Sequence, residues 1–331
     1  MLAHRYLDDW LARRTTVAQI ASHRFARLYP LHLYGLFGML AFSLVRSAMF
    51  APADLSFVKA LQSGIDLYPD GRAYTFVLHL LLAQNIGLTP LGTSWHGPSW
   101  SISVEFFCPL LLFLFVGFWR PGTGAGRNTG FVAPTIILAF VCALSVINGA
   151  RTLDVSYQNL TVWANYGVLR CLAELATGLV AYRIWRALPA DVEPGRTAVA
   201  IVTIAEVLLL AGCCMLLFRR VWTSPNDVLA IPLFAGLVLM LATGRGFIAQ
   251  TLTLQPFRWV GQLSYSVYIN HFLVVMSLSL IIGTQWWLYS FFAEQKWPYF
   301  AVVLGLSWLT FTYIENPARR ALNARLARIA I

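Results

Sequence analysis

Charged side chains are scarce in this sequence of 331 residues, since only 11% are Asp, Glu, Lys or Arg while 58% are hydrophobic. A water-soluble protein of this length would form about two domains, and its surface would carry many more charged residues. The mean hydropathy of +0.66 instead predicts a polytopic membrane protein. The net charge of +10 comes from Lys and Arg at the ends of apolar runs, not from one basic patch. This pattern favours membrane topology and excludes nucleic acid as the expected partner.

The sequence also lacks metal-binding and disulfide motifs. Its five cysteines all lie in apolar stretches, without CxxC or Cys/His spacing. We therefore interpret them as small hydrophobic residues of helices and expect no metal site.

Eight apolar runs are long enough to be considered for a hydrocarbon core that requires about 20 helical residues. The predicted spans are residues 28–45, 98–119, 131–148, 165–185, 198–218, 228–243, 262–283 and 297–315. Basic residues at both ends place segments 1–27 and 316–331 in the cytoplasm, as a lead-in and a tail, so the number of crossings must be even.

A ninth apolar stretch, residues 74–92, is interrupted by His79, Gln84, Asn85 and Pro90. Counting it as a span would give an odd number, so it is predicted to be re-entrant or to lie on the outer surface. The predicted fold is therefore all-α: a polytopic transmembrane helix bundle of about eight spans plus one re-entrant or peripheral segment. We expect it to form a single domain over residues 1–331.

Glu105 lies about two helical turns inside the span that starts near Pro98. The predicted topology puts it roughly 10 Å below the outer face. Ser101 and Cys108 share its side of the helix. Ionisable residues inside membranes are rare and usually functional, although a purely structural pairing with another helix is the alternative.

Two further charged or titratable positions fall inside predicted spans. Arg170 is expected at a depth similar to that of Glu105, and either Glu105 or Glu174, one turn further on, would neutralise it. This arrangement is compatible with a structural pair or a catalytic one. His271 lies near mid-membrane, where it would serve as a general base for a hydroxyl group or as a polar bridge between helices.

Arg24 and Arg27 lie three residues apart, just before the first predicted span. Two guanidinium groups on one helix face can grip phosphate. The alternative is a positively charged anchor at the cytoplasmic edge.

Together these motifs resemble acyltransferase family 3, the integral-membrane O-acyltransferases. The matching segments, in the order of the family, are residues 24–30, 99–105, 169–174, 261–271 and 313–320. The resemblance implies that Arg24 and Arg27 bind acyl-CoA. With these matches added to the chemistry of the residues, we predict Glu105, Ser101, His271 and Arg170 as the catalytic set. Supporting residues would be Trp100, Ser103, Glu174, Tyr265 and Glu315.

The resemblance further implies transfer of an acyl group, usually acetyl, from cytoplasmic acyl-CoA to a hydroxyl of a cell-envelope or secreted glycan. The expected partners are the lipid bilayer, the glycan acceptor and the acyl-CoA co-substrate, with no tightly bound cofactor. The expected location is the bacterial inner membrane. Specificity for the acceptor is expected in the outer loops, around residues 46–97 and 284–296.

One departure from the family pattern concerns the start of the chain. Members carry two further spans before the arginine motif, and the first contains the histidine thought to act as catalytic base. Residues 1–7 resemble the stretch after those spans, and neither His4 nor His23 matches that histidine. We therefore expect impaired activity from the chain as written, which we interpret as an incomplete version of an active enzyme in preference to a true truncation.

Two other functional classes fit parts of this pattern. A non-catalytic partner would keep the acyl-CoA end without the base. A transporter or glycan exporter would also bury charges at mid-depth, but it would more often show inverted repeats with paired broken helices. The sequence contains one interrupted segment, 74–92, without a counterpart.

Overall fold

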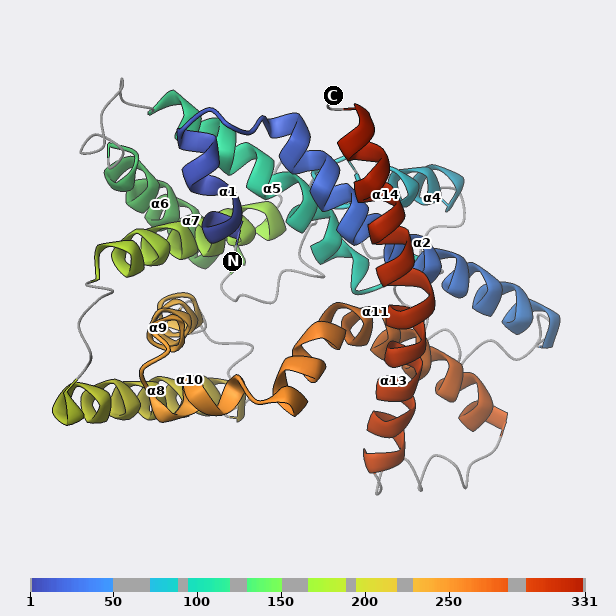
Figure 1. Cartoon of the computed structure of the whole chain (residues 1–331). Coiled ribbons are helices and arrows are strands. Elements are labelled where there is room, and N and C mark those ends of the chain that lie inside the picture. The colour runs from blue at the N-terminus through green and yellow to red at the C-terminus, as the bar shows by residue number, and fades with distance from the viewer. Residues whose placement is uncertain are drawn as a thin grey trace. The chain divides into compact units, whose positions relative to one another are not determined.

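The computed structural model is all-helical wherever it describes the chain, namely residues 2–49, 72–88, 95–119, 130–150, 166–188, 195–218, 229–284 and 296–329. No strand occurs in those ranges. In chain order (Figure 1), the elements are α1 (Leu2–Leu11), α2 (Val17–Met49), α4 (Arg72–Leu80), α5 (Ser99–Phe118), α6 (Val132–Ala150), α7 (Tyr166–Ala187), α8 (Arg196–Phe218), α9 (Ala230–Ala242), α10 (Phe247–Leu252), α11 (Gln255–Thr284), α13 (Lys296–Thr310), the π-helix η5 (Phe311–Glu315) and α14 (Asn316–Ile329).

Four of these regions are long and apolar enough to cross a membrane: Val17–Arg46, Ser99–Phe118, Arg196–Leu217 and Trp297–Leu326. Helices also occupy the other predicted spans, but α9 has only 13 residues and α7 carries several charges. The all-α membrane fold is thus confirmed, while the count of eight spans stays a prediction. In segment 74–92 the helix α4 ends at Leu80 and turns follow to residue 88, so no full-length helix forms there.

The helix α2 begins eleven residues before the predicted start of the first span at Leu28. A capping box fixes this start: the Thr16 N–H donates to Gln19 Oε1 over 2.9 Å, and the Gln19 N–H donates to Thr16 Oγ1 over 3.2 Å. Residues 17–27, predicted as part of a cytoplasmic lead-in, therefore belong to the same helix as the span.

The chain divides into two compact units. Unit 1 comprises Met1–Ile20 and Phe107–Arg258, and unit 2 comprises Ala21–Phe106 and Trp259–Ile331. The prediction of a single domain is not tested by this division and stays a prediction.

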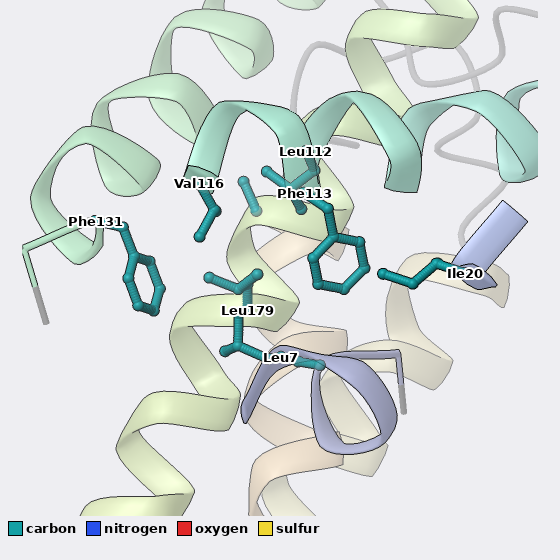
Figure 2. Packing of buried hydrophobic residues seen from close by; sticks show 9 residues of the cluster. Leu7, Ile20, Leu112, Phe113, Val116, Phe131 and Leu179 are labelled. Atoms are coloured by element: carbon teal, nitrogen blue, oxygen red, sulfur yellow. The ribbon is translucent and has the colours of Figure 1, made fainter. Parts of the chain in front are cut away.

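Unit 1 has an apolar core in which α1 packs against α7 and the apolar part of α5 (Figure 2). The buried side chains of this core are Ala3, Leu7, Ile20, Leu112, Phe113, Val116, Phe131, Ala176 and Leu179. At its edge Asp8 accepts a hydrogen bond of 2.8 Å from the Tyr182 hydroxyl and lies 3.6 Å from the Arg186 guanidinium. These contacts tie α1 to α7.

The buried Glu206 of unit 1 serves as a cap for another helix. Its carboxylate accepts the Ile248 N–H over 2.9 Å, and Thr203 Oγ1 accepts the Phe247 N–H over 3.1 Å. These N–H groups open α10 and have no partner within that helix. A Cβ on Gly246 would overlap the Glu206 carboxylate, which explains glycine at that position.

In unit 2, α2 and α11 run parallel and close together. Tyr265 bonds Leu28, while Gly35 and Gly38 approach Ile269 and Leu273. The contacts follow the same order along both helices and end in an apolar cluster of Met39, Phe42 and Met276. The predicted topology requires this parallel direction, since both segments are expected to run outward.

Candidate functional site

The centre of the candidate site is an ion pair between α2 and α5. Arg24 Nη2 lies 3.4 Å from Glu105 Oε1 and also donates to the Glu105 backbone carbonyl. The Arg24 side chain is 6% exposed, whereas that of Glu105 is 45% exposed. Arg24 therefore holds the α5 backbone in place, while the Glu105 carboxylate remains accessible.

This pair is incompatible with the combination of two depths inferred from the sequence. Arg24 was expected at the cytoplasmic edge and Glu105 about 10 Å below the outer face. A hydrocarbon core is about 30 Å thick, so two groups 3.4 Å apart cannot satisfy both placements. The sequence left Arg24 as a phosphate-binding residue or a positively charged anchor at the cytoplasmic edge. In the structure it lies inside the candidate span Val17–Arg46, buried against α5.

The two arginines of the motif have different surroundings. Arg24 is buried, whereas Arg27, one turn along α2, is exposed. The Arg27 charge acts electrostatically on Tyr265 and Glu315. Arg27 is thus the guanidinium of the pair that lies open at the protein surface.

Hydroxyl groups join the start of α5 to α11. Ser101 Oγ lies 2.7 Å from the Tyr268 hydroxyl, and both hydroxyls also donate to the Pro98 carbonyl, over 3.1 Å and 2.9 Å respectively. On the buried side of α5, Ser103 Oγ accepts the Asn85 N–H over 3.2 Å. Trp100 directly precedes Ser101 and is half-buried.

A second carboxylate, Glu315, lies buried at the end of η5. Its Oε2 accepts a hydrogen bond of 2.7 Å from Ser266 of α11. One turn along α11, Asn270 donates to Thr310 Oγ1 over 2.8 Å. Single π-helical turns inside helices occur frequently at functional sites. The Tyr265 hydroxyl donates to the Leu28 carbonyl over 2.7 Å, so α11 bonds both α2 and the helix that carries Glu315.

His271 is half-buried on α11, one turn after Tyr268, and the centroids of their rings are 5.7 Å apart. Its backbone carbonyl accepts a hydrogen bond of 3.2 Å from the Tyr299 hydroxyl. Its role as a general base stays a prediction.

Arg170 and Glu174 lie in unit 1, on α7. Arg170 Nε is 2.8 Å from Glu174 Oε1, one turn away. Of the two carboxylates considered for Arg170, Glu174 is the one it bonds, while Glu105 bonds Arg24.

The sequence interpretation assigned no role to three buried histidines of unit 2: His32, His79 and His96, each at most 1% exposed. His32 Nε2 donates to the His79 carbonyl, and His79 Nδ1 donates to the Thr75 carbonyl, both over 2.8 Å. In the sequence, His32 and His79 stand in apolar runs, which alone does not separate a site from a packing residue, and His96 stands in a turn-rich segment without such a signal.

Two of these histidines, His79 and His96, lie outside the candidate spans. Burial lowers the pKa of His79 to about 4 and that of His96 to about 3. Hydrogen bonds to backbone groups of Thr75 and Ile269 oppose this shift, whereas the neighbouring histidines add to it. Both rings are therefore neutral at pH 7.

No cluster of three or more His, Cys, Asp or Glu with metal-binding geometry occurs among the described residues. Unit 2 offers the chemistry of two carboxylates, guanidinium groups, hydroxyls and imidazoles.

The profile of the acyltransferase domain family matches residues 10–314. This match covers most of the chain and both compact units. The chain belongs to the acyltransferase 3 family. No curated protein and no solved structure matches it.

In this acyltransferase, the matched range includes Arg24, Glu105, Arg170 and His271, while Glu315 follows directly after it. Membership of the family, with the apolar helices, identifies an integral membrane protein of the acyltransferase class. Of the predicted site residues, unit 2 contains Arg24, Arg27, Trp100, Ser101, Ser103, Glu105, Tyr265, His271 and Glu315.

Proposed function

We propose that this acyltransferase lies in the bacterial inner membrane and moves an acyl group, in the first instance acetyl, from cytoplasmic acyl-CoA to an acceptor hydroxyl. The proposed acceptor is a cell-envelope or secreted glycan. The observation that carries the proposal is the Arg24–Glu105 pair within a chain of the acyltransferase 3 family. The pair supports the proposal because its carboxylate is held in place yet remains accessible.

In the proposed reaction the acceptor hydroxyl oxygen attacks the thioester carbonyl carbon. A C–O bond forms, the C–S bond breaks, and the hydroxyl proton passes through a base to the departing thiolate. Glu105 orients the hydroxyl or the acyl group, with Ser101 and Tyr268 beside it. His271 is the proposed base. Trp100, Ser103, Tyr265 and Glu315 support these groups.

Arg27 is proposed as the contact for the phosphates of acyl-CoA. Arg24 is buried against α5, while Arg27 is exposed and keeps a bidentate donor set for phosphate. For Arg170 we propose a structural role, because its bond to Glu174 lies within one helix.

The proposal is tested by two measurements on the full chain: acetyl-CoA binding in detergent, and transfer of labelled acetyl to alkali-labile esters in envelope glycans of membrane vesicles. We expect acetyl-CoA binding together with slow transfer. Binding without transfer would favour an impaired homologue or a non-catalytic partner. The absence of both binding and transfer would contradict the proposal and would leave the transporter as the alternative.

Substitution at Arg27 separates phosphate binding from anchoring. Arg27→Ala should weaken acetyl-CoA binding about tenfold or more, because a charge-assisted hydrogen bond contributes about 1.5–3 kcal/mol. The acetyl-CoA affinity of Arg27→Lys should lie between those of the unmodified chain and Arg27→Ala, since an ammonium group cannot bind phosphate bidentately. The matched control is Arg196→Ala, which removes an exposed arginine at the start of the apolar helix α8. An equal loss in the control would contradict the assignment.

A further inference from the structure

The proposed transfer reaction leaves the buried histidines of unit 2 without a role. His32 comes from α2, His79 from α4, and His96 from the segment just before α5. The His96 ring lies edge-on to Phe272 of α11 and close to Gly35 of α2. Four parts of the chain thus converge on this cluster.

The hydrogen bonds of the cluster fix its tautomers. A backbone carbonyl can only accept, so His79 Nδ1, which bonds the Thr75 carbonyl, must carry the proton. His79 Nε2 is then an unprotonated acceptor. In His96 the ring bonds the backbone of Ile269, and Nε2 is the nitrogen left over.

These acceptor atoms are buried and lack donors. Among the described residues, His79 Nε2 and His96 Nε2 have no hydrogen-bond partner. Gln84 shows the same pattern: its amide nitrogen donates to the Ser99 carbonyl over 2.7 Å, which leaves its buried Oε1 without a donor. A buried polar atom left without a partner is costly, so three acceptors in one region call for a ligand that donates.

The cluster adjoins the carboxylate of the proposed active site through α5. Ser99, whose carbonyl binds Gln84, precedes Glu105 by six residues, or about 9 Å along the helix. Asn85, next to Gln84, bonds Ser103 on the same helix. A ligand on the histidines would therefore lie less than two turns of α5 from Glu105.

We infer that His79, His96 and Gln84 form a subsite that binds hydroxyl groups of a polyhydroxylated acceptor beside Glu105. This inference rests on the proposed function for the identification of the ligand as the acceptor. The low basicity of both imidazoles suits a subsite that accepts hydrogen bonds and leaves proton removal to another group. Hydroxyl donors come from sugars or from water, and the test distinguishes these sources.

Diethyl pyrocarbonate provides the test because it acylates unprotonated imidazole nitrogen. The full chain in detergent is treated near pH 6, alone and with a mixture of methyl glycosides of glucose, galactose and N-acetylglucosamine. Modified peptides are then measured by mass spectrometry. The control ligands are the permethylated glycosides, which keep the ring but have no hydroxyl donors. Exposed His4 of unit 1 reports the activity of the reagent.

The expected result is modification of His79 and His96 that the glycosides suppress and the permethylated sugars do not. No modification in the folded chain would show that the cluster is closed to ligands and would overturn the inference. Modification unaffected by the glycosides would indicate water alone, and protection by both sugar sets would indicate apolar binding. Either result also overturns it.

Two variants of His79 separate its nitrogens. His79→Asn keeps a donor near Nδ1 and removes the acceptor, whereas His79→Gln places an acceptor near Nε2. The glycoside concentration that half-protects His96 should rise about tenfold in His79→Asn and less in His79→Gln. Equal effects would contradict the acceptor role. Because protection is measured without acyl-CoA, transfer activity without protection would retain the proposed function and overturn only the subsite.

Discussion

The two compact units bury different chemistry. Sixteen buried residues in the described part of the chain are polar or charged, and all but Thr135 and Glu206 belong to unit 2. Unit 1 instead buries the aliphatic and aromatic cluster around Leu7, Phe113 and Phe131 (Figure 2).

Each unit also holds an ion pair, and the two pairs differ in structure. In unit 1, Arg170 and Glu174 are neighbours on one helix, both partly exposed, an arrangement that contributes little to stability. In unit 2, Arg24 and Glu105 come from different helices, and the arginine is buried. From this difference we propose that unit 1 serves as scaffold, whereas unit 2 combines polar groups that packing alone does not require.

The largest expected difference between the units follows from neutralising one carboxylate in each. Glu105→Gln should lower acetyl transfer about 100-fold or more, because it removes the charge that orients the reacting group. It should change Tm little, since Glu105 is about half exposed and the Arg24 bond to the backbone remains. The measurements are initial rates of label transfer and Tm in detergent.

The control for that experiment is Glu174→Gln, which neutralises the unit 1 pair. Transfer should stay within about twofold of the unmodified chain, as expected for an exposed pair within one helix. Equal losses in both variants would remove the functional distinction between the units.

A second test uses acid. Unfolded histidines titrate near pH 6.5, whereas in the folded chain burial lowers the pKa to about 4 for His79 and about 3 for His96. Between these values the unfolded state binds more protons, so stability is present above pH 6.5 and is lost as the pH falls toward 4. The shift of His79 alone corresponds to on the order of 3 kcal/mol.

The measurement is Tm as a function of pH in detergent. Replacing His79 and His96 by Asn should flatten the curve below pH 6.5, although His32 and His271 still act on this region. His4→Asn in unit 1 should leave the curve unchanged, because His4 is exposed. An unchanged slope in the double variant would show that other groups control the acid transition.

Helix contact gives a third comparison. A Cβ on Gly35 of α2 would lie 2.9 Å from Ile269 Cγ2 and 3.3 Å from His96 Nε2, whereas one on Gly178 of α7 meets nothing within 4 Å. Gly35→Ala should therefore destabilise unit 2 by about 1–3 kcal/mol. Gly178→Ala should stabilise its helix by about 0.5–1 kcal/mol. Thermal unfolding in detergent of both variants checks the opposite signs.

The sequence predicted the helices better than their contacts. Apolar runs placed α5, α6 and α8 to within two residues, because helix formation in lipid follows directly from hydrophobic length. The start of α2 was missed because a polar first turn does not reveal whether it continues a span. The capping box at Thr16 and Gln19 marks this start with a local sequence pattern.

The site was predicted as residue types and not as partners. Glu105 was recognised from its charge in an apolar run, but Arg24 was assigned to the membrane edge by the rule for positive charge. That rule describes loops. It does not anticipate a buried arginine that pairs with a carboxylate from another helix. The π-turn at Glu315 and the convergence of His79 and His96 depend on tertiary packing, which no local pattern specifies.

The smallest expected effect concerns the buried carboxylate of unit 1. Glu206→Gln keeps an oxygen that can accept the Ile248 N–H, so transfer should be unaffected and stability should change by less than about 1 kcal/mol. Glu206→Ala removes this acceptor, so the Ile248 N–H at the start of α10 loses its partner. The free energy of unfolding should fall by about 1–3 kcal/mol. Tm and label transfer of both variants provide the check. If Glu206→Gln abolished transfer while Tm held, a buried charge in unit 1 would belong to the catalytic apparatus, and the assignment of chemistry to unit 2 alone would be wrong.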